Sequence, residues 1–159
     1  MKTSDKILTK EQLSALLPLW KKEGKVVFTN GCFDILHLGH VDYLEKARNL
    51  GQKMIVGLNT DASVQRLKGP ARPICDENSR SRVMASLEFV DAVILFDEET
   101  PFELIDYLKP DILVKGNDYT IQTIVGADVV LKNGGSVETV PLVNGYSTTN
   151  VINKIKLLT

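Results

Sequence analysis

The only two histidines of this 159-residue chain, His37 and His40, lie in a segment that reads NGCFDILHLGH. Gly31 and Gly39 in this segment let the backbone approach a ligand closely. A helix beginning near His40 would point free N–H groups and the positive end of its dipole at a phosphate. Nucleotidyl and phosphoryl transfer need positioning and charge stabilisation more than covalent catalysis, so two imidazole donors at this place favour that chemistry.

Other interpretations of the histidine pair stay open. A lone histidine in a loop is more often an ordinary polar residue, and histidines also bind zinc. The two cysteines, Cys32 and Cys75, are far apart in the sequence and form no CxxC pair. They therefore indicate neither a zinc site nor a disulfide framework, and we expect them to be reduced thiols of a cytoplasmic protein.

Two further segments have residue types that suit a nucleoside triphosphate. Ser147, Thr148 and Thr149 open the last predicted helix. Hydroxyls and free N–H groups at a helix start form a phosphate seat, although a simple N-cap has the same composition. The sequence VKGNDY follows a predicted strand, and its Gly116 would permit close approach while its Asp118 could hold ribose hydroxyls. An ordinary turn is the alternative for this segment.

A basic stretch follows the second predicted strand and contains Arg66, Lys68, Arg72, Arg80 and Arg82. Charged side chains usually form a solvated face, and that is our interpretation for most of them. Lys68 is the exception, because a lysine on a loop could close over a triphosphate and neutralise charge that develops on pyrophosphate. Arg82 is a weaker candidate for binding the phosphate of a sugar phosphate.

Alternating strands and helices must position these residues. Strands that read as apolar runs indicate burial on both faces, and their alternation with helices indicates βαβ units and a parallel sheet. We predict a doubly wound α/β fold of five parallel strands in a single domain, 1–159, on which residues 1–24 pack as a helical extension. The predicted strands are 25–30, 53–58, 92–96, 112–114 and 136–140, and the predicted helices are 10–23, 39–50, 61–67, 79–89, one that begins at 100–101, 124–133 and 148–158.

The ligand site of such a sheet lies beyond the carboxyl ends of the strands, where the strand order reverses. The candidate residues follow predicted strands, as this rule requires. Asn59 and Asp61 stand at the end of the second predicted strand. We therefore expect them to contact the acceptor sugar.

Composition argues against several other functions. With 19 basic and 20 acidic side chains the formal net charge is −1, so we expect no nucleic-acid partner, which would need a clustered basic surface. Residues 1–10 are polar and lack the apolar run of a signal peptide. No apolar run approaches the roughly 18 residues of a membrane span, so we expect no membrane partner.

The sequence GCFD followed by HLGH resembles the HxGH superfamily of nucleotidyltransferases, whose fold is Rossmann-like and of the HUP type. The chain is similar to the cytidylyltransferase-like branch, and within it most similar to D-glycero-β-D-manno-heptose 1-phosphate adenylyltransferases. That activity is often the C-terminal half of a bifunctional enzyme with a heptose kinase half, and here we expect it to act without the kinase. The resemblance covers about residues 13–155.

The resemblance implies transfer of AMP from ATP to heptose 1-phosphate, giving ADP-heptose and pyrophosphate for lipopolysaccharide or other cell-surface glycans. It also implies Mg²⁺, a homodimer, and catalytic roles for His37, His40 and Lys68. Whether Asp34 orients the site or contacts a metal is left open by the spacing. The implied nucleotide-binding residues are Asn30, Gly31, Cys32, Phe33, Asp34, Gly39, Lys115, Gly116, Asp118, Ser147, Thr148 and Thr149.

Three other functions fit the same motifs. A cytidylyltransferase acting on glycerol 3-phosphate or a related alcohol phosphate would use the same HxGH and Ser-Thr-Thr elements, and a flavin adenylyltransferase is a weaker option. A module that binds a nucleotide without turning it over would not need both histidines. The motifs do not specify the base or the acceptor, so the choice of ATP over CTP and the identity of the acceptor stay open.

Overall fold

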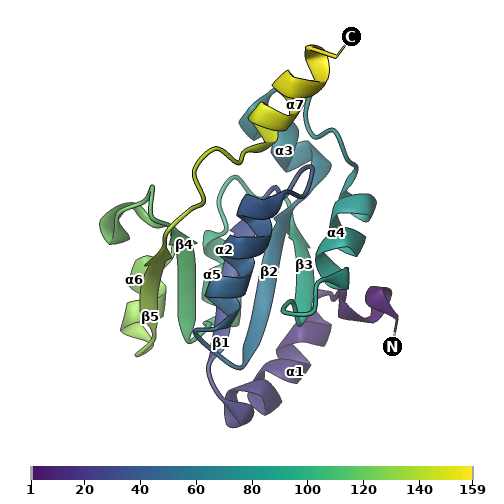
Figure 1. Cartoon of the computed structure of the whole chain (residues 1–159). Helices are drawn as coiled ribbons and strands as arrows, with labels where there is room; N and C mark the ends of the chain where they lie inside the picture. Colours follow the sequence, from purple (N-terminus) through teal and green to yellow (C-terminus); the bar gives the residue numbers. More distant parts are fainter. Residues whose placement is uncertain (1, 159) are drawn as a thin grey trace.

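The computed structural model describes residues 2–158, so the first and last residues of the predicted domain lie outside the described part. Five parallel strands form one sheet in the order β3-β2-β1-β4-β5 (Figure 1). The predicted five-stranded parallel sheet is confirmed. The strands are β1 (Val26–Gly31), β2 (Lys53–Asn59), β3 (Ala92–Phe96), β4 (Ile112–Gly116) and β5 (Ser136–Val140).

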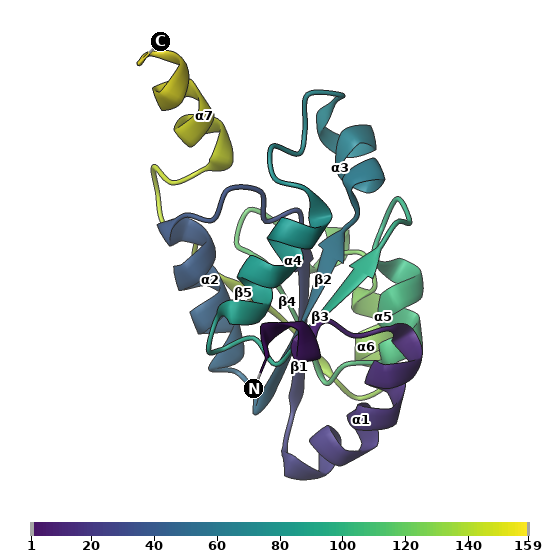
Figure 2. The ribbon, with the colours of Figure 1, turned by 90° about the vertical axis from the view of Figure 1, so that its right-hand side faces the viewer.

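Helices cover both faces of the sheet (Figure 2). One face carries α1 (Lys10–Glu23), α5 (Phe102–Leu108) and α6 (Ala127–Lys132), and the other carries α2 (Leu38–Arg48) and α4 (Glu77–Ser86). Beyond the carboxyl edge of the sheet lie α3 (Asp61–Lys68) and α7 (Thr148–Lys156), and two short 3-10 helices are η1 (Thr3–Lys6) and η2 (Ile121–Thr123). Within residues 2–158, none of the helices has the length and apolar character needed to cross a membrane.

Alternate residues of each strand belong to two apolar cores, one under each layer of helices. In β2, Met54, Val56 and Leu58 pack with α2 and α4, whereas Ile55 packs with α1, α5 and α6. All four side chains are fully buried. Burial on both faces explains why the strands read as continuous apolar runs in the sequence.

The N-terminal helix is part of this layered structure. Thr9 begins it with a capping box, in which the Thr9 side chain accepts a hydrogen bond from the N–H of Gln12 and the Gln12 side chain accepts one from the N–H of Thr9. Leu13 and Leu17 are buried in the core shared with α5 and α6. The helix predicted for 10–23 is confirmed, and it covers the sheet directly.

The helix predicted for 79–89 begins and ends earlier than expected. The Asp76 side chain caps it by accepting a hydrogen bond from the N–H of Ser79, so α4 starts at residue 77. The buried residues of α4 are therefore Arg80, Ser81, Met84 and Ala85, whereas the apolar side chain of Val83 is exposed.

The helix predicted for 124–133 is shorter in the structure, where η2 precedes α6. Gly126 lies between them with a left-handed φ of +83°, and a Cβ there would approach Ile105 Cδ1 to 2.7 Å. The close packing against α5 therefore requires glycine at this position. The left-handed backbone of Gly126 also sets the point where α6 begins, at residue 127.

The strand order reverses at β1. The chain passes from β1 to β2 on one side, and it reaches β4 on the other side of β1 only after β3. The register pairs Val27 with Ile112 and Phe28 with Leu113. The residues that follow β1 therefore lie beside Lys115 at the carboxyl edge, where a ligand crevice is expected.

Candidate active site

Two residues between β1 and α2 have a left-handed backbone. Phe33 and Ile35 have φ of +44° and +56°. Such values cost energy for residues with a Cβ, especially a β-branched one, and persist where surrounding contacts enforce them. Asp34 lies between them and is buried, and its side-chain contacts help to hold this turn.

Asp34 fastens the turn to the segment before α4. Its Oδ2 accepts hydrogen bonds of 2.8 Å from Arg72 Nε and from the N–H of Ile74, and its Oδ1 accepts one of 2.9 Å from the N–H of Cys75. Burial acts to raise the pKa of Asp34, but these hydrogen bonds outweigh it and the pKa is lowered. With three donors and no exposed side-chain surface, this carboxylate fastens the turn after β1 to the segment before α4.

The two histidines lie face to face at the start of α2. Their ring centroids are 3.8 Å apart and the ring planes are 20° from parallel. The ring of Phe33 meets His40 edge-on at 5.3 Å. A Cβ on Gly39 would lie 3.1 Å from the His37 ring, so the glycine of the HxGH motif leaves space for this stacked arrangement.

Burial keeps both imidazoles mainly neutral at pH 7 in the protein without ligand. Burial lowers the pKa of His37, and burial together with the adjacent His37 ring lowers the pKa of His40 to about 4. Among the described residues, neither Nδ1 atom has a hydrogen-bond partner, and both are buried. A bound phosphate would supply negative charge and raise both pKa values, so the pair suits an anionic ligand.

The depressed pKa of His40 predicts a pH-dependent stability. Its folded-state pKa of about 4 lies below the ordinary value of 6.5, so its contribution is complete above pH 6.5 and is lost as the pH falls toward 4. From pH 7 to pH 5 we expect the free energy of unfolding to lose about 2 kcal/mol through this ring. Urea unfolding of the wild type and of His40→Gln at both pH values measures it: the variant should lose less stability, and equal losses would contradict the prediction.

The start of α7 lies against the turn that follows β1. Ser147 is the N-cap, and its Oγ accepts a hydrogen bond from the N–H of Asn150. Thr148 Oγ1 donates to the carbonyl oxygen of Asp34 at 2.6 Å. The hydroxyls and free N–H groups of this helix start are thereby held beside the histidine segment, in a position that suits phosphate.

Lys115 reaches from the end of β4 toward β1. Its Nζ donates to Asn30 Oδ1 at 2.5 Å and lies 5.8 Å from the centre of the Tyr119 ring. Burial lowers the pKa of Lys115 to about 8, against the raising effect of Asp118. Because its hydrogen-bond partner is a neutral amide, the charge of Lys115 is available to an anionic ligand.

Two adjoining cavities lie over these segments. The first has a volume of about 440 Å³ and extends from His37 to Leu142 and Tyr146. The second has a volume of about 480 Å³ and extends to Asn59 and Arg72. Residues at their junction line both cavities and include Asn30, Cys32, His40, Lys68, Lys115 and Thr148.

The structure brings nearly all the predicted site residues to these cavities. Besides the junction residues just named, Gly31 and Phe33 line both. The first cavity alone is lined by His37, Gly39, Gly116, Asp118 and Ser147. The second alone is lined by Asp34, Asn59 and Thr149. Asp61 and Arg82 line neither cavity.

A family model described as cytidylyltransferase-like matches residues 28–154, from β1 to α7. The chain belongs to this family. The match includes every segment that lines the two cavities, and it confirms the resemblance found in the sequence.

The curated relatives of this cytidylyltransferase-like chain are longer proteins. The bifunctional protein HldE of Syntrophotalea carbinolica is 56% identical over 151 residues, which are 94% of this chain and 31% of the relative. The bifunctional protein HldE of Magnetococcus marinus is 55% identical over 153 residues, 96% of this chain and 31% of the relative. The chain thus spans about a third of the length of these relatives.

Solved structures share the fold of this cytidylyltransferase-like chain. The lipopolysaccharide core biosynthesis protein from Thermoplasma volcanium is 35% identical with a TM-score of 0.60, over 78% of this chain and 99% of that one. The pantoate-β-alanine ligase from Francisella tularensis is 15% identical with a TM-score of 0.61, over 95% of this chain and 77% of that one. The second likeness concerns the fold alone, and the predicted fold class is confirmed.

The prediction that Arg82 binds the sugar phosphate is corrected by the structure. Arg82 lies on the outer side of α4, where its Nε donates to Thr3 Oγ1 at 2.9 Å. Residues two positions apart on a helix point in nearly opposite directions. Because α4 buries Arg80, it turns Arg82 away from both cavities of this cytidylyltransferase-like domain.

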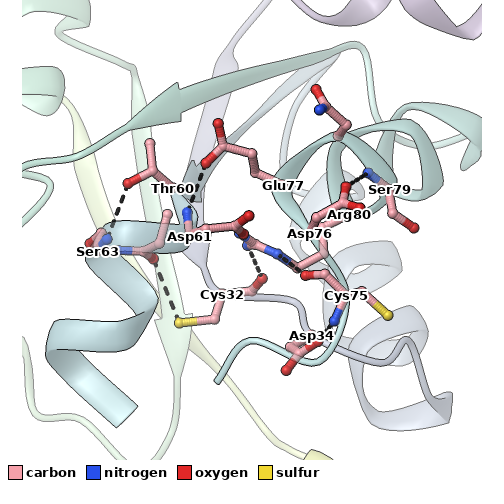
Figure 3. Close-up of polar contacts among 12 residues, drawn as sticks. Cys32, Asp34, Thr60, Asp61, Ser63, Cys75, Asp76, Glu77, Ser79 and Arg80 are labelled. Carbon is pink, nitrogen blue, oxygen red and sulfur yellow. Dashed lines mark hydrogen bonds and ion pairs between the residues drawn. The ribbon is translucent and has the colours of Figure 1, made fainter. Parts of the chain in front are cut away.

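Asp61 is linked to the turn after β1 through the buried Arg80 (Figure 3). Arg80 Nη2 donates to Asp61 Oδ1 at 2.7 Å, and its Nη1 donates to the carbonyl oxygen of Cys32 at 2.7 Å. Its Nε donates to the carbonyl oxygen of Cys75 at 3.0 Å. This guanidinium joins the start of α3, the turn after β1 and the segment before α4, and it occupies one carboxylate oxygen of Asp61, which lines neither cavity.

Sequence reasoning gave no site role to several residues that line the cavities. Arg72 was grouped with solvated charges, because the loop between α3 and α4 has no periodic pattern that would reveal burial. Tyr43 bonds to Thr29 Oγ1 at 2.6 Å and donates to the carbonyl oxygen of Val114 at 3.0 Å, a contact across β1 and β4 that no local pattern shows. Tyr119 belongs to the VKGNDY segment, and the sequence predicts no role for it.

Proposed function

We propose that this chain transfers AMP from ATP to D-glycero-D-manno-heptose 1-phosphate, giving ADP-heptose and pyrophosphate for the synthesis of lipopolysaccharide or another cell-surface glycan. The observation that carries the proposal is the stacked pair of His37 and His40, which lines the first cavity and reaches its junction with the second at His40. The membership of the cytidylyltransferase-like family and the identity with HldE proteins support it.

In the proposed reaction an oxygen of the acceptor phosphate attacks the α-phosphorus of ATP. A new P–O bond forms there, the bond to the oxygen that bridges the α- and β-phosphorus breaks, and its electron pair leaves on pyrophosphate. His37, His40 and Lys68 stabilise the charge of the leaving group together with the hydroxyls and N–H groups at the start of α7. No general base is needed, because a phosphate monoester is already an anion.

The proposed nucleotide cavity is the first one. It combines the histidine pair and Ser147 with apolar side chains at Leu142 and Val143, which suit a base, and with Asp118, which suits ribose hydroxyls. A cavity with a polar end for phosphates and an apolar end for a base is typical of nucleotide sites.

Magnesium is part of the proposal as a partner of the triphosphate. Within residues 2–158 no group of three or more His, Cys, Asp or Glu residues is placed to hold a metal ion. Triphosphate oxygens and waters are the expected ligands, as Mg²⁺ commonly has in such sites. We also propose a homodimer, from the resemblance, and a cytoplasmic location, in keeping with the free thiols of Cys32 and Cys75.

Pyrophosphate release tests the function. ATP and CTP are each paired with heptose 1-phosphate and with glycerol 3-phosphate in the presence of Mg²⁺. We expect release with ATP and heptose 1-phosphate alone, because the resemblance is closest to the heptose enzymes.

Each other outcome would change the proposal in a defined way. Release with CTP and glycerol 3-phosphate would keep the chemistry and replace both substrates, and the chain would still belong to the cytidylyltransferase-like family. No release in any of the four pairings, together with intact ATP binding, would favour a binding module that does not turn its nucleotide over.

A further inference from the structure

The second cavity is lined by an arginine, Arg72, whose residue type and position in the sequence predict only a solvated charge. Arg72 lines this cavity, and its side chain is only 17% exposed. Its Nε donates to Asp34 Oδ2 at 2.8 Å. Asp34 has no exposed side-chain surface and is held by two further N–H groups, so it fixes the guanidinium plane firmly.

The remaining donors of Arg72 are free. Within residues 2–158, no hydrogen bond or ion pair to Nη1 or Nη2 of Arg72 is found. A guanidinium presents its donors as a rigid planar fork that matches the oxygens of a phosphate. With Nε already bound to a buried carboxylate, the two Nη atoms are left for a ligand in the cavity.

The charges around the second cavity favour a phosphate monoester. Its lining carries the cations Lys68, Arg72 and Lys115, and the single carboxylate in the lining is Asp34, whose oxygens are already bonded. The positive field reaches the junction of the cavities: burial raises the pKa of the Cys32 thiol, but the charges of Lys68, Arg80 and Arg72 each act to lower it.

The two cavities have different characters around a common junction. The histidine pair and the apolar wall line the first, whereas Asn59 and Arg72 line only the second. In-line displacement needs the attacking and leaving oxygens on opposite sides of the α-phosphorus. An acceptor in the second cavity would attack toward the junction while pyrophosphate departs beside the histidines.

We propose that Arg72, held in place by Asp34, binds the phosphate monoester of the acceptor through its two Nη atoms and so makes the second cavity the acceptor subsite. The inference rests on the proposed function, because it supposes that a phosphate monoester is the acceptor. Arg72, and not Arg82, would then bind the phosphate group of the acceptor.

The variant Arg72→Met tests this assignment, with Arg66→Met as the matched control. Arg66 is an exposed arginine on the nearby α3, paired with Asp97 and outside both cavities. We expect Arg72→Met to raise the KM for heptose 1-phosphate at least tenfold and to leave the KM for ATP within twofold. Arg66→Met should change neither. A purely structural role would raise both constants together, and that result, or an unchanged acceptor KM, would overturn the inference.

A binding measurement separates this inference from the proposed reaction. Heptose 1-phosphate, or glycerol 3-phosphate, is titrated calorimetrically into protein saturated with α,β-methylene-ATP, which cannot be turned over. Loss of at least tenfold in affinity on Arg72→Met, without pyrophosphate release by the wild type, would refute the reaction and support the subsite. Failure of both monoesters to bind the wild type would overturn the subsite.

The variant Arg72→Lys keeps the inference testable if Arg72→Met does not fold. Lysine keeps the charge but replaces the planar fork with a point charge. We expect it to retain the unfolding transition and to weaken acceptor binding at least threefold, with ATP binding unchanged. Wild-type affinity for the acceptor in Arg72→Lys would show that the fork has no role.

Discussion

Replacing His37 with alanine should lower turnover at least about a hundredfold, the scale seen when one donor to a developing charge is removed. The reason is the position of His37, stacked at 3.8 Å on His40 at the start of α2 and lining the proposed nucleotide cavity. Steady-state pyrophosphate release at saturating ATP and acceptor measures the effect. Thermal unfolding followed by circular dichroism shows whether the fold is retained.

Arg82→Ala is the matched control for the histidine variant. Arg82 is a polar side chain that lies outside both cavities and contacts Thr3, so its removal should leave turnover within about twofold, as expected for a surface side chain. Near-normal turnover of His37→Ala with an unchanged melting curve would contradict the catalytic role of His37.

Replacing Arg80 with methionine should lower the free energy of unfolding by about 3 kcal/mol, the scale for removing one member of a buried hydrogen-bonded charge network. Arg80 is 2% exposed and donates to Asp61 and to the carbonyl oxygens of Cys32 and Cys75 (Figure 3). Methionine fills a similar volume but satisfies none of these acceptors. Urea unfolding measures the change.

The control for Arg80 stands two residues away on the same helix. Arg82→Met removes an exposed guanidinium with one hydrogen bond to Thr3, and we expect it to change the free energy of unfolding by less than about 0.5 kcal/mol. A double variant with Asp61→Asn separates the ion pair from the two carbonyl contacts. Equal stability of Arg80→Met and the wild type would show that the guanidinium does not hold the three segments together.

The elements of this fold could be predicted from the sequence because they depend on local patterns. Apolar runs predicted the first four strands, and the apolar spacing of Leu13 and Leu17 predicted the helix that became α1. The parallel sheet then follows, since strands that alternate with helices must be joined by crossovers. Helix boundaries were less accurate where a cap or a glycine contact decided them, as at Asp76 and Gly126.

The residues after β1 and at the start of α7 could also be predicted as a site, because the types His, Gly, Ser and Thr at strand ends already indicate phosphate chemistry. The sequence placed His37, His40 and Thr148 near the carboxyl edge, and the structure brings all three to the cavities. The stacking of the two rings and the low pKa of His40 could not be predicted, because both depend on burial by Phe33 and the surrounding turn.

The amino-acid sequence by itself determined the fold class, the family and the segments that line the site, since these depend on periodicity and on motifs that are continuous along the chain. Only the tertiary structure decided the roles of the charged residues between α3 and α4. Arg72 joins Asp34, 38 positions earlier, and Arg80 joins Asp61 and Cys32, whereas Arg82 faces Thr3. The residue type arginine does not show whether its guanidinium is buried or exposed, because burial depends on contacts between segments that are distant in the sequence.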